Sequence, residues 1–225
     1  GHSASYAVES YQTLFLKAYY PIEYMVATIN NGGGFYRPEL YIHEARMHGA
    51  HVEAPCLLRS DMKSIVDGKT IVLGFHTIRD LDTRTVGLLL KAREDAPFQS
   101  LADFVDRVPV GVEQLELLVK VGAFRFTGKN KKELTWQARL MLGKAPKKEV
   151  QPRLFTPQPK PYKFPDLYTA PLEEAFDQIE LLGYPLCDPF VLSNRSMKGG
   201  ILAADVPEYL GKTVVVYGYL ITARK

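Results

Sequence analysis

The feature that most restricts the fold is a concentration of proline between residues 144 and 170. Six prolines fall in these 27 residues. Proline lacks a backbone N–H and fixes its φ angle, so the stretch can neither continue a helix nor lie inside a sheet. We therefore predict an extended, proline-rich linker, with a mostly helical region before it and a shorter region after it.

Apolar spacing, capping residues and glycine stops divide the region before the linker into short helices. They are predicted over 3–19, 22–29, 38–47, 83–91, 100–107, 112–121 and 130–142. Between the third and fourth helices, alternating residues from His51 to Ala54 and from Thr70 to Phe75 flank an Asp67-Gly68 turn signal. This pattern predicts a small β ribbon or sheet.

The region after the linker is expected to begin with a helix that Pro171 opens and Gly183 ends. A short helix is predicted over 206–210, and the β-rich run 213–222 is predicted to be the first strand of a truncated domain. The expected fold is mainly α. We expect the chain, as a piece of a longer protein, to divide into segments 1–76, 77–143, 144–170, 171–211 and 212–225.

Composition excludes several classes of protein. Hydrophobic residues make up 46% and charged residues 24%, a balance typical of globular proteins. No apolar run approaches the ~20 residues that span a bilayer, so no membrane partner is expected. The two cysteines, Cys56 and Cys187, have no zinc-ligand spacing, and lone thiols fit a reducing, cytoplasmic compartment.

Two helix–hairpin–helix units are suggested around 78–92 and 115–132. Such hairpins offer N–H groups and a helix N-terminus to phosphate oxygens. Directly after the second hairpin, residues 125–148 contain eight basic residues and one acidic residue, Glu133. This imbalance favours contact with a nucleic-acid backbone. The alternative is a solvated helix face followed by a flexible linker.

A second candidate lies within the linker, where Gln151 precedes the pair Leu154 and Phe155. An extended peptide of this kind can anchor two apolar side chains in a partner's pocket while the amide binds at its rim. The alternative is that these side chains pack back onto the parent fold.

Signals for catalysis are missing from the sequence. It has neither a Walker phosphate loop nor a Gly-x-Ser-x-Gly motif. His43, His48 and His51 do not share a helix face, and the aspartates near residues 61–82 resemble turn formers. We therefore assign no catalytic and no metal-binding residue.

The opening stretch Gly1–Asn30 carries a long and specific pattern. Its matching positions are His2, Tyr6, Ala7, Ser10, Tyr11, Gln12, Thr13, Leu16, Lys17, Ala18, Tyr20, Pro21 and Glu23. This pattern resembles the end of the fingers region of bacterial DNA polymerase III alpha subunits, the C-family replicative polymerases. Matches to the family's sequence motifs continue to Pro185-Leu186, so the resemblance covers essentially the whole chain. It implies an internal fragment that ends at the start of an OB domain.

The resemblance implies that the helix–hairpin–helix unit contacts the backbone of primer–template duplex. The residues expected there are Arg79, Arg84, Lys120, Gly122, Ala123, Arg125, Thr127, Lys129, Asn130, Lys131 and Lys132. Gln151, Leu154 and Phe155 match the family's peptide that binds the sliding clamp (beta). The resemblance also suggests His2 and Ser3 as neighbours of the nucleotide site, the alternative being a helix-capping or core role.

The resemblance further implies a parent DNA-directed DNA polymerase that acts with other polymerase III holoenzyme subunits. Its catalytic aspartates and Mg²⁺ belong to a palm domain upstream, so we expect this fragment alone to be inactive. Its expected contribution is processivity, since backbone contacts permit sliding and the clamp tether maintains a high effective concentration.

Two departures from the family pattern matter. The first hairpin reads Asp80-Leu81-Asp82 where the family has Gly-Val-Gly, and carboxylates there would repel phosphate. We therefore expect this hairpin to be structural. Tyr184 replaces the family's histidine before Pro185-Leu186.

Three other functions stay open. The parent could be the error-prone paralogue of the same family, although the clamp peptide favours the replicative form. The fragment could be a clamp-binding module without DNA affinity. A helix–hairpin–helix base-excision glycosylase would need a catalytic Asp or Lys just after the hairpin, and residues 122–132 supply lysines but no aspartate.

Overall fold

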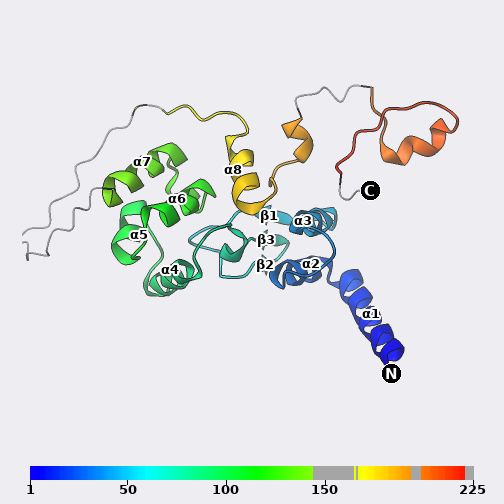
Figure 1. Cartoon of the computed structure of the whole chain (residues 1–225), viewed down its shortest axis with the longest axis horizontal. Coiled ribbons are helices and arrows are strands. Elements are labelled where there is room, and N and C mark those ends of the chain that lie inside the picture. The colour runs from blue at the N-terminus through cyan, green and yellow to red at the C-terminus, as the bar shows by residue number, and fades with distance from the viewer. Residues whose placement is uncertain (144–164, 166, 194–198, 221–225) are drawn as a thin grey trace, which may run out of the picture. The chain divides into compact units, whose positions relative to one another are not determined.

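A computed structural model of the chain describes residues 1–143, 165, 167–193 and 199–220. The chain divides into two compact units, Gly1–Leu186 and Cys187–Lys225 (Figure 1). The first unit is mainly helical with one small sheet, as the sequence predicts. Of the expected linker, only residues 165 and 167–170 are described, and they form neither helix nor strand. No helix among the described residues is both long and apolar enough to cross a bilayer.

The chain begins with three helices, α1 (His2–Tyr19), α2 (Pro21–Asn30) and α3 (Pro38–Met47). Proline at the first turn suits the starts of α2 and α3, since the N–H it lacks has no partner there. Ile22, Met25, Val26 and Ile29 recur at helical spacing and form the buried face of α2. By contrast, no side chain of α1 is buried.

A three-stranded sheet follows, with β1 (His51–Glu53), β2 (Ile65–Asp67) and β3 (Thr70–Val72) in the order β1-β3-β2. Strand β3 pairs antiparallel with β2 across the turn at Gly68, and parallel with β1 in the register Val52 opposite Ile71. Gly68 adopts a φ of +60°, a conformation that glycine takes at little cost. The predicted ribbon is thus confirmed and extended to three strands.

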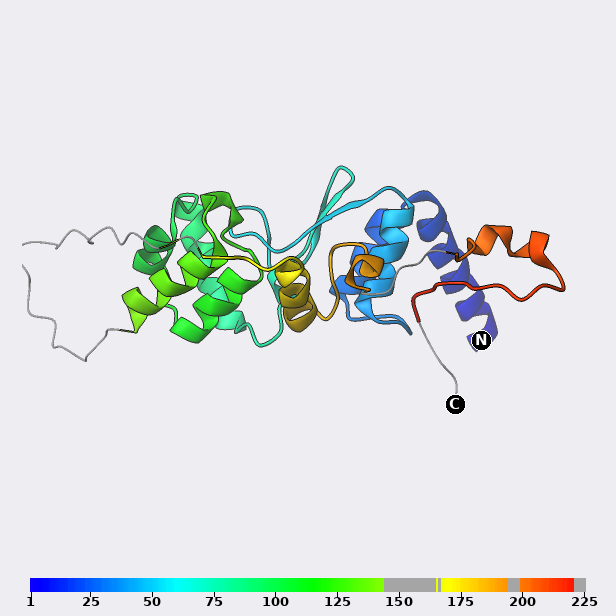
Figure 2. The same ribbon diagram turned by 90° about the horizontal axis from the view of Figure 1, so that it is seen from above.

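Two helical hairpins form the next layer. The short 3-10 helix η1 (Phe75–Thr77) leads into α4 (Thr83–Asp95), and α5 (Leu101–Arg107) connects to the second hairpin. That hairpin consists of α6 (Val112–Lys120), the 3-10 turn η2 (Arg125–Thr127) and α7 (Lys131–Leu142). Figure 2 shows these four helices gathered at one end of the first unit, in green.

Capping chemistry explains most of these boundaries. The side chains of Asp82, Ser100 and Asn130 each accept a hydrogen bond from a backbone N–H in the first turn of the helix they precede. Helix α4 is one turn longer than predicted, since helix-favouring residues continue to Glu94. Pro97 then disfavours helical backbone at Ala96, which ends the helix.

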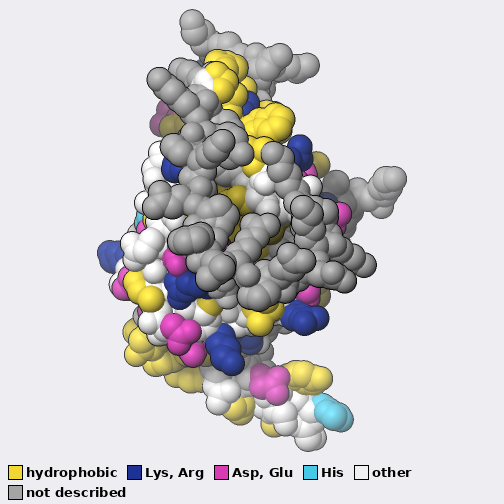
Figure 3. Space-filling view, turned by 90° about the vertical axis from the view of Figure 1, so that its left-hand side faces the viewer, with side chains coloured by type: hydrophobic (Ala, Val, Ile, Leu, Met, Phe, Trp, Pro, Cys, Tyr) yellow, Lys and Arg dark blue, Asp and Glu magenta, His cyan; other side chains and the backbone are white. Residues whose placement is uncertain are grey.

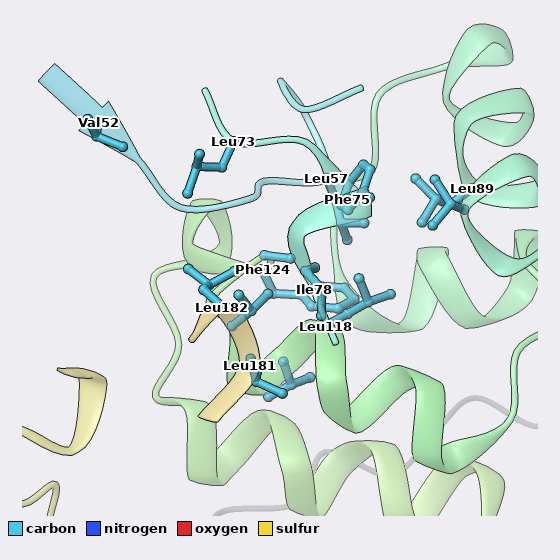
Figure 4. Close-up of a cluster of buried hydrophobic side chains, with 14 of the residues drawn as sticks. Val52, Leu57, Leu73, Phe75, Ile78, Leu89, Leu118, Phe124, Leu181 and Leu182 are labelled. Carbon is cyan, nitrogen blue, oxygen red and sulfur yellow. The ribbon is translucent and has the colours of Figure 1, made fainter. Parts of the chain in front are cut away.

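Helix α8 (Glu173–Leu182) closes the first unit. It begins two residues later than predicted, because Leu172 has a left-handed φ of +71° and lies outside the helix. Gly183 ends it with a φ of +93°, as predicted. Leu181 and Leu182 are buried, and Figure 4 shows Leu182 beside Phe124 of the second hairpin.

One hydrophobic core runs through the first unit. It joins the buried side of α2 and α3 to the sheet, the two hairpins and the end of α8. Phe104 and Phe124 meet edge to face within it, with ring centroids 5.3 Å apart. The backbone N–H of Leu57 donates to the carbonyl of Ala123 at 3.1 Å, so the loop after β1 is tied directly to the second hairpin.

The described part of the second unit contains two 3-10 helices, η3 (Pro189–Leu192) and η4 (Ala203–Tyr209). Helix η4 overlaps the predicted short helix at 206–210. The strand predicted over 213–222 is not formed in the described residues 213–220. In this run, the carbonyl of Val215 accepts a hydrogen bond from the backbone N–H of Ile201 at 3.0 Å.

Candidate nucleic-acid interface

The second hairpin, residues 121–130 between α6 and α7, is the centre of the candidate interface. Gly122 and Gly128 both adopt left-handed backbone, with φ of +82° and +66°. The N–H of Ala123 returns to the carbonyl of Leu118 at 2.9 Å, which ends α6 in a tight turn. At the other side, the Asn130 side chain accepts from the N–H of Lys132 at 2.8 Å and starts α7. These contacts fix the hairpin backbone.

A cavity of about 410 Å³ lies on this hairpin. Apolar side chains including Phe124 and Leu134 form part of its wall. The cations of Arg125, Lys129 and Lys131 also line it. A concave surface with three cations and flanking glycine backbone has the chemistry to receive an anionic oxygen group. Glu174 is the one carboxylate among the described lining residues.

Three of the predicted DNA-contacting lysines form ion pairs with α8. Lys120 Nζ lies 2.6 Å from Glu180 Oε2, and Lys131 Nζ lies 2.5 Å from Glu174 Oε2. Lys132 Nζ lies 3.0 Å from Glu173 Oε2. A fourth carboxylate, that of Asp177, is 3.2 Å from Lys131 Nζ. The second hairpin is therefore not a purely basic surface.

The acidic side chains of α8 differ in their protonation behaviour. A hydrogen bond from Lys132, with another from the Ala170 N–H, holds the pKa of Glu173 below its ordinary value. Burial raises the pKa of Asp177, and the nearby lysines only partly oppose this effect. The sequence analysis assigned no role to the four carboxylates of α8 at positions 173, 174, 177 and 180. Their spacing, which places them on one side of a helix, is the sequence pattern that could have indicated an acidic face.

Arg125 serves the structure of the hairpin. Its guanidinium donates to the carbonyls of Pro55 at 2.8 Å and Ala54 at 2.9 Å, and it lies 3.4 Å from Glu53. These contacts attach the hairpin to the end of β1. The side chain is still partly exposed.

The other predicted residues of the second hairpin have local partners. Lys129 Nζ lies 3.3 Å from Glu133 one helical turn later. The Thr127 hydroxyl donates to the carbonyl of Phe124 at 2.9 Å. Both interactions are near the surface, so the Lys129 ammonium can exchange its partner at little cost.

The first hairpin has a structural organisation. Asp80 holds a φ of +60°, and the Asp82 carboxylate accepts from the N–H of Arg84 at 3.0 Å to cap α4. Gln114 of α6 accepts from the N–H of Asp82 at 2.7 Å and donates to the carbonyl of Asp80 at 2.9 Å. These bonds support the expectation that this hairpin is structural.

Arg79, just before the first hairpin, contacts α8. Its backbone N–H donates to the carbonyl of Leu181 at 2.8 Å, and its guanidinium donates to the carbonyl of Glu180 at 3.3 Å. A Cβ at Gly183 would lie 2.7 Å from this guanidinium, so glycine permits the close approach. The structure thus places Arg79 against the end of α8.

The remaining predicted residues lie elsewhere. His2 and Ser3 are exposed on α1, where the His2 ring stacks on Tyr6 with centroids 6.5 Å apart. Gln151, Leu154 and Phe155 lie outside the described residues. On the face shown in Figure 3, basic and acidic side chains are interspersed among the described residues. Within the part of the chain that the structure describes, no three His, Cys, Asp or Glu side chains form a group that could hold a metal ion.

The sequence of this chain is similar to those of known proteins over part of its length. Residues 49–134 match a helix-hairpin-helix motif model. The chain is 36% identical over 127 residues to a DNA polymerase III subunit alpha of Thermus aquaticus, which covers 54% of this chain and 10% of the relative. It is 40% identical over 129 residues to the corresponding subunit of Deinococcus radiodurans, covering 55% and 10%.

Error-prone polymerases match as well. An error-prone DNA polymerase of Vibrio campbellii is 29% identical over 151 residues, covering 64% of this chain and 15% of the relative. The chain spans only about a tenth of the length of the first two relatives. The chain therefore carries a helix-hairpin-helix motif in a region homologous to a segment of bacterial DNA polymerase III alpha subunits and error-prone DNA polymerases.

Proposed function

We propose that this chain is the duplex-binding segment of a bacterial, cytoplasmic C-family DNA polymerase. The observation that carries the proposal is the helix-hairpin-helix motif at 49–134, within a region homologous to polymerase alpha subunits. The second hairpin supports it, because its cavity combines left-handed glycine backbone with Arg125, Lys129 and Lys131. These groups would contact phosphate oxygens without reading base sequence.

The parent enzyme would join deoxynucleotides to a primer end, with Mg²⁺ held by its palm. The segment would hold the duplex behind that site while the enzyme advances. Gln151, Leu154 and Phe155 would bind the sliding clamp, and the parent chain would contact other holoenzyme subunits. The clamp peptide is the sequence feature that favours the replicative form over the error-prone one.

The experiment is a titration of the chain against fluorescent primer–template duplex at several salt concentrations. Binding should be independent of sequence and should weaken steeply with salt, because each phosphate contact releases counterions. Lys131→Ala with Lys132→Ala should weaken binding and reduce the magnitude of the salt slope by about two. The matched control is Lys63→Ala with Lys69→Ala, which removes the same charge from two exposed positions, one just before β2 and one in the turn between β2 and β3. Equal losses in both double variants would contradict a specific role for the hairpin.

A further inference from the structure

The segment 167–177, which we name the strap, lies over the N-terminal end of α7. The Asn130 side-chain amide donates to the carbonyl of Leu167 at 3.1 Å and to the Thr169 hydroxyl at 2.9 Å. The Lys132 ammonium donates to the carbonyl of Tyr168 at 2.6 Å. The strap thus offers oxygen acceptors to groups at the start of α7.

The second half of the strap adds negative charge at the same place. Glu173 pairs with Lys132, while Glu174 and Asp177 pair with Lys131. The carboxylate of Glu174 also lines the hairpin cavity. The strap thus surrounds the two lysines with carboxylate and carbonyl oxygens. A phosphate diester of DNA would offer the same lysines the same kinds of acceptor, namely anionic and neutral oxygens.

The strap is less firmly held than the helix end that follows it. Leu181 and Leu182 are almost fully buried in the core, whereas the Tyr168 and Phe176 side chains are mainly exposed. Between the two halves of the strap, Leu172 holds a left-handed φ that a branched side chain adopts only at an energetic cost. Ala175 is buried within the strap, so α8 itself stays packed on the core. The carboxylates of Glu173 and Glu174 are partly exposed, and they can give up the lysines to another anion at little cost.

Resting on the proposed function, we propose that the strap is an intramolecular competitor for the phosphate-binding face of the second hairpin. Phosphates of duplex DNA can contact Lys131 and Lys132 only by replacing the carboxylates that now pair with these lysines. The strap thereby lowers duplex affinity and limits tight binding to ligands dense in negative charge.

The test compares duplex affinity after removal of charge from the strap and from a matched surface. Glu173→Gln with Glu174→Gln keeps an acceptor oxygen at each position. The control, Glu94→Gln with Asp95→Asn, removes the same charge from the exposed end of α4. Neither of these side chains forms an ion pair among the residues that the structure describes. The strap variant should bind duplex about tenfold more tightly than this control, since partly exposed ion pairs no longer compete.

The outcomes separate this inference from the proposed function. Equal affinity of the strap variant and its control would overturn the proposed competition by the strap, but not the proposed function. Absence of binding by every protein at low salt, the strap variant included, would overturn both. Hydrogen exchange of the wild-type chain gives a second measurement that needs no substitution. Amides of the strap should exchange faster when duplex is added, and slower exchange there would instead make the strap part of the bound surface.

Discussion

At the scale of single residues, two carboxylates on α8 respond differently to similar neighbours. Lys132 donates to Glu173 near the surface and keeps the pKa of that carboxyl below its ordinary value. Asp177 is 3.2 Å from Lys131, yet burial raises its pKa. A short distance between opposite charges therefore does not decide whether the pair stabilises the fold, because desolvation acts against the ionised form.

Asp177→Asn and Glu173→Gln should consequently have different effects near neutral pH. A raised pKa means that the folded state favours neutral Asp177, so Asp177→Asn should leave the free energy of unfolding unchanged or increase it. Glu173→Gln should lower that free energy by up to about 1 kcal/mol. Urea unfolding of the three proteins measures both effects. A loss of about 3 kcal/mol or more in Asp177→Asn would mean that its pairing with lysine outweighs the cost of burial.

The two pKa directions also fix the pH dependence of these differences. As pH falls through the raised pKa of Asp177, the wild-type chain gains stability relative to Asp177→Asn, because the buried charge is neutralised. The wild-type advantage over Glu173→Gln is present above the ordinary pKa of a glutamate. It is lost as pH falls through the lowered pKa of Glu173. Repeating the urea series at several acidic pH values measures both trends.

At the scale of elements, the two hairpins are built differently. The second hairpin turns on glycines, whereas the first turns on Asp80 and uses Asp82 to cap α4. Asp82→Ala should lower the free energy of unfolding by about 1 kcal/mol, because the N–H of Arg84 loses its acceptor. Asp82→Asn keeps an acceptor oxygen and should stay close to the wild type in the same urea measurement. Equal losses in both variants would show that the charge of Asp82 at the helix N-terminus matters more than its hydrogen bond.

The same elements show what sequence could and could not predict. Ser100, Asn130 and Gly183 act through bonds or backbone angles within a few residues, so the helix boundaries they set were predictable. The pairing of Lys131 with Glu174 joins positions far apart in the chain and depends on how α8 packs on the core. The strand expected over 213–222 was wrong for residues 213–220, because β-favouring composition alone does not decide whether a segment forms a strand.

At the scale of the whole molecule, the core of the first unit crosses the boundary expected between residues 76 and 77. Met25 in α2 and Phe124 in the second hairpin belong to one cluster of buried side chains, with the sheet between them. A continuous core is the condition under which distant helices unfold together. We therefore expect the segments 1–76 and 77–143 to behave as one cooperative unit.

The single tryptophan, Trp136 on α7, makes this expectation measurable. Met25→Ala removes a buried side chain from α2 and should cost about 2–5 kcal/mol. In urea, the free energy of unfolding obtained from Trp136 fluorescence should fall by the whole of this loss, although the substitution leaves α7 itself unchanged. Glu23→Gln, at an exposed position of the same helix, should leave the transition within about 0.5 kcal/mol of the wild type. An unshifted Trp136 transition in Met25→Ala would show two independently folding parts, because the loss at α2 would then not reach the helix–hairpin–helix layer.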